Sequence, residues 1–302
     1  MKPFVIWTAL LAVFAFFSFL GPAHGEYRLP PLSDEEKVFF RDVRRSDSAL
    51  WVGVLPLQSP TKLANMFLPL CDYLSENLGI EVVFVTAPDF TRFMQRYEAG
   101  FYDIVYSNPY QYVRARNRQG YSVFAKVAGE PFVGIFIARK DWGQKAFNPD
   151  NLRGKTIAFV HPFAWASALM TSAHLLDRGI DPGRDMTVKY VGSQDSVILA
   201  VENGMAEIGG TWRPSLRLMD RMEDDIMVIE ETEPQPQMPL SAHPRVAPDV
   251  VDRLRGLLVE LAGTEEGKEI LKRLELPMGF EPASDAEYDA VRNLANKLGM
   301  PY

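Results

Sequence analysis

From residue 50 onward, the apolar positions of this chain follow the periods of strands and helices in turn. Residues 50–55 form a short apolar run typical of a buried strand. Ser59 and Pro60 then form a typical helix start, and apolar residues recur at helical spacing up to Gly79, which should end the helix. The same alternation predicts further strands at residues 81–86 and 103–106 and further helices at residues 90–97 and 109–118.

The alternation begins again in the second half of the chain. The pattern predicts strands at residues 156–160, 186–190, 208–210 and 225–229, with helices at residues 164–176 and 196–203. Strands alternating with helices favour a mostly parallel sheet that carries helices on its faces. Two such series predict an α/β protein of two lobes, which we place at residues 50–133 plus 244–302 and at residues 134–243.

Two crossover strands should connect these lobes. We expect them near residues 132–138 and 239–244, and the proline-rich run at residues 233–239 has the stiffness of a hinge strand. The tail, at residues 248–274 and 285–298, has helical spacing and should return to the first lobe.

The N-terminus has the pattern of a secretory signal peptide. Lys2 precedes an apolar run at residues 4–20, and the small residues Ala23 and Gly25 precede the cleavage that we predict before Glu26. The run is slightly short for a membrane span, so an uncleaved anchor is the weaker alternative. We therefore expect a periplasmic protein with a signal peptide at residues 1–25 and a polar arm of unassigned role at residues 26–49.

Composition and motifs argue against several classes of function. The net charge of −7 disfavours a nucleic-acid partner. Cys71 is the only cysteine, which excludes an internal disulfide and any CxxC motif. The mature chain would keep His161, His174 and His243, which form no metal-binding or catalytic spacing, and the chain contains no GxSxG, P-loop or GxGxxG motif. We therefore expect no enzyme activity, no metal site and no cofactor.

Ligands of open α/β sheets bind beyond the carboxyl ends of strands, where helix N-termini point outward. Four predicted strand–helix loops have this character, at residues 56–60, 106–110, 161–167 and 192–195, and residues 211–213 follow a fifth strand. The candidate ligand-binding residues are Gln58, Ser59, Tyr106, Ser107, Asn108, Tyr110, Trp165, Ala166, Ser167, Gln194, Asp195, Thr211, Trp212 and Arg213.

These residue types imply different roles. Tyr110 and Trp165 could offer aromatic surfaces, Ser107 and Asn108 hydrogen-bonding groups, and Asp195 an acceptor or a helix cap. Polar residues at a helix start are, however, more often simple caps. Arg213 could pair with an anionic ligand or lie on the surface beside a core tryptophan, and the sequence leaves both readings open.

Several segments resemble one known family in the family's own order. They are GFYDIVYSNPY at residues 100–110, NLRGKTIAFV at residues 151–160, GSQDS at residues 192–196 and FEPASDAEY at residues 280–288. In these runs the chain resembles the phosphonate/phosphite/phosphate-type substrate-binding proteins of ABC transporters. The resemblance implies a type II periplasmic binding protein with two crossover strands, a small-molecule ligand in its cleft and a membrane permease as partner.

The ligand loop departs from that family. Relatives usually have a Ser-Thr-Ser-Gly run where this chain has Ala164, Trp165, Ala166 and Ser167, and the family's His-Asp pair is replaced by Gln194 and Asp195. Each lost charge-assisted hydrogen bond is worth roughly 1.5–3 kcal/mol, so phosphate, phosphite and phosphonates should bind weakly. The ligand would then be a flatter or more apolar solute that stacks on Trp165, or an oxyanion held mainly by N–H groups.

The expected function is that of the solute-binding component of an ABC-type uptake system. The alternative is a periplasmic sensing protein that feeds a membrane receptor or a histidine kinase. Both would close two lobes on a ligand by a hinge motion. The residues of the cleft do not distinguish them.

Overall fold

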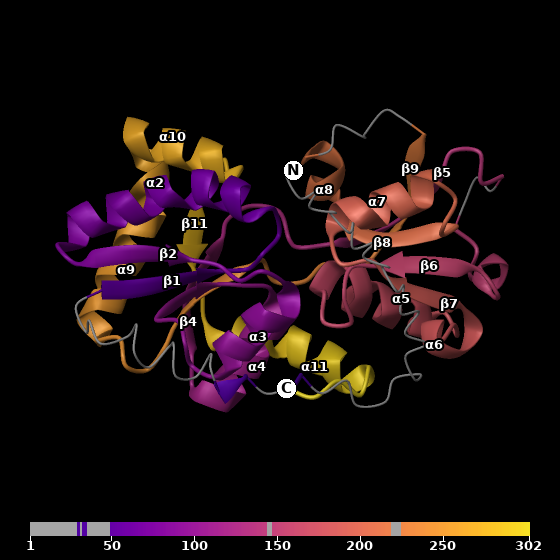
Figure 1. The fold of residues 1–302 in the computed structure, drawn as a ribbon, viewed down its shortest axis with the longest axis horizontal. Helices are drawn as coiled ribbons and strands as arrows, with labels where there is room; N and C mark the ends of the chain where they lie inside the picture. The colour runs from indigo at the N-terminus through magenta and orange to yellow at the C-terminus, as the bar shows by residue number, and fades with distance from the viewer. Residues whose placement is uncertain (1–28, 31, 35–48, 144–146, 219–224) are drawn as a thin grey trace, which may run out of the picture.

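A computed structural model describes residues 29–30, 32–34, 49–143, 147–218 and 225–302 and shows two lobes side by side (Figure 1). The predicted signal peptide and most of the predicted arm lie outside the described residues. Of the arm, Leu29 and Leu32 pack against the core of the first lobe, and the carbonyl of Pro30 accepts a hydrogen bond from Gln95. No helix in the described part of the chain combines the length and apolar character needed to cross a membrane.

Lobe 1 is built on a six-stranded sheet with the order β11-β4-β10-β3-β1-β2. Its strands are β1 (Ala49–Val54), β2 (Glu81–Val85), β3 (Ile104–Tyr106), β4 (Ser122–Val127), β10 (Pro239–Ala242) and β11 (Phe280–Pro282). Its helices are α2 (Pro60–Leu78), α3 (Phe90–Glu98), α4 (Pro109–Gln119), α9 (Pro248–Glu260), η3 (Leu261–Gly263), α10 (Glu265–Leu274), η4 (Asp285–Tyr288) and α11 (Asp289–Lys297).

Lobe 2 is built on a five-stranded sheet with the order β7-β6-β8-β5-β9. Its strands are β5 (Gly134–Arg139), β6 (Thr156–Phe159), β7 (Thr187–Tyr190), β8 (Ile208–Trp212) and β9 (Ile226–Glu231). Its helices are η1 (Pro149–Leu152), η2 (Trp165–Met170), α5 (Thr171–Asp177), α6 (Pro182–Asp185), α7 (Gln194–Glu202) and α8 (Arg213–Leu218).

The predicted helix boundaries in lobe 1 are confirmed and have local causes. The hydroxyl of Ser59 accepts a hydrogen bond from the backbone of Lys62, and Gly79 ends α2 in the left-handed conformation at φ 67°. Asn108 and Gln111 form a reciprocal capping box at the start of α4. These caps fix where each helix begins beside the sheet edge.

Both sheets contain parallel and antiparallel strand pairs, whereas the sequence predicted mostly parallel sheets. Strand β1 pairs in parallel with β2 and β3, and β6 pairs in parallel with β7 and β8. The strands that adjoin the crossovers pair antiparallel: β10 with β3 and β4, and β5 with β8 and β9. The chain enters and leaves each lobe through neighbouring connections. The strands that adjoin these connections therefore run in opposite directions.

The crossovers lie at residues 128–133 and 232–238, which corrects the predicted positions. Residues 134–138 are buried within β5 of lobe 2, and β10, which the predicted boundary at residue 243 puts in lobe 2, belongs to the sheet of lobe 1. Of the proline-rich run, residues 233–238 lie in the second crossover, and Pro239 begins β10. The two crossovers pair through Phe132 and Gln235, whose backbones exchange hydrogen bonds of 2.9 and 2.8 Å.

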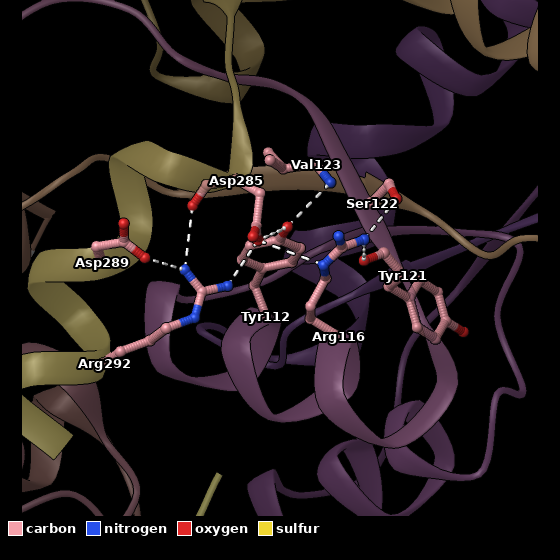
Figure 2. Close-up of polar contacts among 8 residues, drawn as sticks. All are labelled: Tyr112, Arg116, Tyr121, Ser122, Val123, Asp285, Asp289 and Arg292. Carbon is pink, nitrogen blue, oxygen red and sulfur yellow. Dashed lines mark hydrogen bonds and ion pairs between the residues drawn. The ribbon is translucent and has the colours of Figure 1, made fainter. Parts of the chain in front are cut away.

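The tail returns to lobe 1, as predicted. Figure 2 shows Asp285 of η4 at the centre of a polar cluster with α4 and α11. The hydroxyl of Tyr112 donates to Asp285 at 2.5 Å, and Arg292 donates to the same carboxylate oxygen at 2.7 Å. The carboxylate thereby holds the tail against α4, the helix whose N-terminus faces the other lobe.

Candidate functional site

A cavity of about 40 Å³ lies between the lobes, with room for only a few water molecules. Both lobes and both crossovers contribute to its walls. The lining residues are Leu55, Pro56, Leu57, Phe90, Asn108, Phe132, Val160, Ala164, Trp165, Ala166, Gly192, Ser193, Gln194, Trp212 and Met238. Of the predicted site residues, the structure brings Asn108, Trp165, Ala166, Gln194 and Trp212 together here.

Trp165 begins η2, the helix that projects from lobe 2 towards the cavity. This helix is a π-helix, in which the N–H of Leu169 donates to the carbonyl of Ala164 at 3.1 Å. Such widened turns are frequent at functional sites. Trp165 is 2% exposed, and its indole Nε1 has no hydrogen-bond partner among the described residues. A buried N–H without a partner is costly, and Trp165 belongs to the cavity lining, so this N–H is a candidate donor to a ligand.

Ser167 holds the helix in place and does not line the cavity. Its hydroxyl accepts from the N–H of Val160 at 2.9 Å and donates to the carbonyl of Gly210 at 2.5 Å. A Cβ on Gly210 would come within 2.1 Å of the Ser167 carbonyl, so only glycine permits this close approach. Ser167 therefore has a structural role here, because its hydroxyl proton and one of its two lone pairs are used internally.

Asn108 contributes the opposite wall from lobe 1. Its side-chain oxygen accepts from the N–H of Gln111 at 2.8 Å, while the Gln111 amide oxygen accepts from the Asn108 N–H at 3.1 Å. The side-chain nitrogen of Asn108, Nδ2, lies 3.5 Å from the carbonyl oxygen of Phe163, at the limit of hydrogen bonding. Asn108 is thus both a cap and a neutral donor beside the cavity.

Gln194 is oriented by a neighbour that lies behind it. The buried Thr211 hydroxyl donates to the Gln194 amide oxygen at 2.6 Å, which leaves the amide N–H groups of Gln194 for other partners. Thr211 itself does not line the cavity. The predicted helix cap is also corrected, because Ser193 caps α7 by accepting from Ser196, and Asp195 lies in the first turn.

The remaining predicted residues lie away from the cavity lining. Tyr110 is fully buried and donates to the carbonyl of Pro301 at 2.6 Å, so it is a core residue and offers no surface to a ligand. Arg213 forms an ion pair with Glu231 on the surface of lobe 2. The other residues outside the lining are Gln58, the exposed cap Ser59, and the buried Tyr106 and Ser107.

Sequence reasoning missed Phe90, Phe132 and Met238. Phe90 follows β2 at the start of α3, a strand–helix loop of the same kind as the four predicted ones, with Asp89 as its helix cap. Phe132 and Met238 belong to the crossovers, whose residues meet the cavity only once the lobes face each other. The order of elements along the chain could have identified Phe90 but not the other two.

The cavity is electrically neutral and rich in aromatic rings. None of the described residues that line it carries an ionisable side chain, and Phe90, Phe132, Trp165 and Trp212 all contribute to the lining. No group of three or more potential metal ligands occurs within the described ranges. The site can therefore bind apolar surface and donate neutral hydrogen bonds, and its lining offers no formal charge to a ligand.

Known proteins share this architecture. The family described as ABC transporter, phosphonate, periplasmic substrate-binding protein matches residues 52–288. A curated relative, the Phosphate-import protein PhnD of Mycolicibacterium smegmatis, is 22% identical over 283 residues, which cover 82% of this chain and 85% of the relative.

Solved structures are similar in fold. PhnD1 from Prochlorococcus marinus, in complex with methylphosphonate, superposes with a TM-score of 0.74 at 17% identity, covering 84% of this chain and 99% of the other. XAC2383 from Xanthomonas citri, bound to a chloride ion, gives 0.70 at 22% identity, covering 84% and 98%. These likenesses confirm the two-lobed type II fold, and the family match covers most of the sequence. The chain belongs to the family of periplasmic substrate-binding proteins of phosphonate ABC transporters.

Proposed function

We propose that the chain captures a compact solute between its lobes, where the cavity of about 40 Å³ would widen to admit it, and delivers it to the membrane permease of an ABC importer. The solute would be neutral or singly charged, with one polar head and an apolar face. Family membership supports a permease rather than a sensor kinase as partner. The protein would act without catalysis, in the periplasm, after export by its N-terminal segment.

The observation that carries this proposal is the neutral, aromatic lining of the cavity. Burial of a charge without a charged or hydrogen-bonded partner is costly, so a doubly charged anion would lose more hydration than this lining returns. A polar head would instead accept from Trp165, Asn108 and Gln194. Its apolar face would lie against the aromatic rings.

The names of the relatives supply the ligands to test first. The Mycolicibacterium relative is named for phosphate import, and the Prochlorococcus structure holds methylphosphonate. Methylphosphonate combines an oxyanion with an apolar methyl group, whereas phosphate has no apolar face. We therefore expect methylphosphonate to bind better than phosphate, and both to bind more weakly than about 1 µM because the hydroxyl-rich ligand loop is absent.

A thermal-shift screen of residues 26–302, followed by calorimetry, tests the proposal. The panel would contain phosphate, phosphite, methylphosphonate, and small neutral amides and aromatic solutes. A ligand that binds only the folded state raises the melting temperature, so the neutral and singly charged solutes with an apolar face should give the larger shifts. Submicromolar binding of phosphate would overturn the proposed ligand class. Binding that survives replacement of both Trp165 and Gln194 by alanine would overturn the proposed site.

A further inference from the structure

The segment His161–Phe163 extends from lobe 2 and packs against lobe 1. We call these residues the interlobe segment. The ring of Phe163 is fully buried, with its centroid 5.8 Å from that of Tyr110, and the guanidinium of Arg114 lies 4.9 Å from the Phe163 centroid. A cation over a desolvated aromatic ring is favourable. Phe163 therefore packs on a surface of α4 formed by Tyr110 and Arg114, which we call the receptor surface.

That receptor surface is held rigidly by lobe 1 itself. Arg114 is 3% exposed, donates to Glu98 at 2.5 Å and donates to the carbonyl of Pro301 at 2.8 Å. Tyr110 donates to the same carbonyl. Because these partners all belong to lobe 1, the guanidinium can remain in position whether or not Phe163 is present.

His161 makes a second contact between the lobes. Its ring stacks on Phe90 with centroids 4.9 Å apart and planes 29° apart, and its Nε2 lies 3.2 Å from the hydroxyl of Thr91. Its Nδ1 accepts from the N–H of Phe163 at 3.2 Å. An accepting Nδ1 carries no proton, so this geometry requires the neutral imidazole.

We propose that His161 and Phe163 are positioning residues that stabilise the closed arrangement of the lobes through direct lobe-to-lobe contacts, and that closure requires a neutral His161. This inference rests on the proposed closure around a solute and adds what holds the lobes together. Neither residue lines the cavity. The interlobe segment also leads directly into η2, so seating it on lobe 1 places Trp165 at the cavity.

The charges around His161 give closure a pH dependence. Burial lowers the pKa of His161 to about 4, opposed by the carboxylate of Asp89 at the start of α3, and Arg114 of α4 lies over the neighbouring Phe163 ring. In open lobes the imidazole would be hydrated and titrate near 6.5. The contribution of the neutral imidazole to closure is therefore fully present above pH 6.5 and is lost as the pH falls towards 4, since only the open form takes up the proton.

Distance measurements between spin labels on the two lobes test this inference. Cys71 is buried, so cysteines introduced by Glu76→Cys in lobe 1 and Thr187→Cys in lobe 2 can be labelled selectively. No ligand is added, which keeps the result independent of the proposed solute. In the wild-type background, the ratio of closed to open molecules should fall roughly tenfold between pH 7.5 and pH 5.5.

Three variants and one control give the contrasting outcomes. Phe163→Ala should lower the closed-to-open ratio at least tenfold at pH 7.5, and Thr91→Val should lower it about threefold. His161→Gln can still bond to Thr91 but does not titrate, so its ratio should not change with pH. Tyr190→Ala removes an aromatic ring that is half exposed on lobe 2 and should leave the ratio unchanged.

Thermal unfolding checks that each variant is folded. Equal ratios in Phe163→Ala and the wild type would overturn the positioning role, and an unaltered pH dependence in His161→Gln would overturn the requirement for a neutral imidazole. Failure of every solute in the ligand screen would sink the proposed ligand class and leave these distances untouched.

Discussion

Trp212 at the end of β8 stacks on Phe132 in the first crossover, with ring centroids 5.2 Å apart and planes 21° apart. Both rings also line the cavity. The stack therefore joins a wall of the ligand site in lobe 2 to one of the two connections about which the lobes would turn. A ligand that contacts Trp212 is thereby coupled to the hinge by a single aromatic contact.

Replacement of the stacked pair should show this coupling. Phe132→Leu and Trp212→Leu should each weaken ligand binding, and the double variant should lose about 1 kcal/mol less than the sum, because an aromatic pair contributes roughly 0.5–1.5 kcal/mol beyond its buried area. A double-mutant cycle by calorimetry measures the difference. Additive losses would indicate that the two rings act separately.

The Trp165 indole should report on the ligand. Trp165→Phe removes the Nε1 donor but keeps an aromatic ring, so the dissociation constant should rise about fivefold to tenfold, equivalent to one neutral hydrogen bond. The ligand-induced change in tryptophan fluorescence should become smaller as well, leaving the contribution of Trp212, which also lines the cavity. Trp142→Phe, in lobe 2 outside the cavity lining, is the matched control and should keep both. An unchanged response in the Trp165 variant would place that ring in the core.

Restoration of the family's hydroxyls should change the ligand preference. The combined substitutions Ala164→Ser, Trp165→Thr and Ala166→Ser rebuild the start of the Ser-Thr-Ser-Gly run. Each new donor to an oxyanion contributes roughly 1.5–3 kcal/mol, so methylphosphonate should bind at least tenfold more tightly than to the wild type. Calorimetry on both proteins measures the gain. A variant that folds but binds no better would show that the loop does not decide ligand choice.

Ser167→Ala should act on stability. It leaves the buried Val160 N–H and Gly210 carbonyl without their partner, at a cost of roughly 2–4 kcal/mol in the free energy of unfolding. Urea unfolding measures this loss. Ser196→Ala, at a partly exposed position of α7, is the control and should cost less than about 1 kcal/mol. Similar values for the two variants would contradict the structural role of Ser167.

The cluster in Figure 2 should make stability depend on acid pH. Burial raises the pKa of Asp285, but hydrogen bonds from Tyr112 and Arg292 outweigh it, and the net effect lowers that pKa. The stabilisation is therefore present above the ordinary carboxyl pKa near 4 and is lost as the pH falls through the lower folded value.

Tyr112→Phe removes one of these hydrogen bonds. It should cost about 1 kcal/mol at pH 7, since solvent partly screens the exposed carboxylate, and the difference from the wild type should shrink below pH 4. Urea unfolding across pH 3–7 measures both effects. A constant difference across this range would mean that the Tyr112 hydroxyl does not act through the Asp285 charge.

The fold was largely predictable because its signals are local. The cap at Ser59, the stop at Gly79 and the apolar spacing between them define α2 without knowledge of the rest of the chain. The predicted positions of the crossovers were wrong because β5 is a continuous apolar run. The place of such a run within a sheet depends on partners far away in the sequence. The antiparallel pairing of β10 has the same origin.

The site was predictable only in part. Asn108, Trp165 and Gln194 lie at loops that follow strands, so the rule for open sheets located them. Tyr110 lies at an equally suitable loop but turns into the core towards Pro301, a partner 191 positions away. The sequence places a residue at a loop, whereas side-chain direction depends on the tertiary packing around it.

The insertion of lobe 2 between β4 and β10 has a consequence for the gene as well as for the protein. Lys126 and Pro239 are neighbours in the sheet of lobe 1, and Ile135 and Glu231 are neighbours in the sheet of lobe 2. Each lobe therefore has adjoining ends at the same place. A short turn in place of residues 128–238 would yield a continuous lobe 1, and residues 134–231 could be exchanged between relatives as a single cassette.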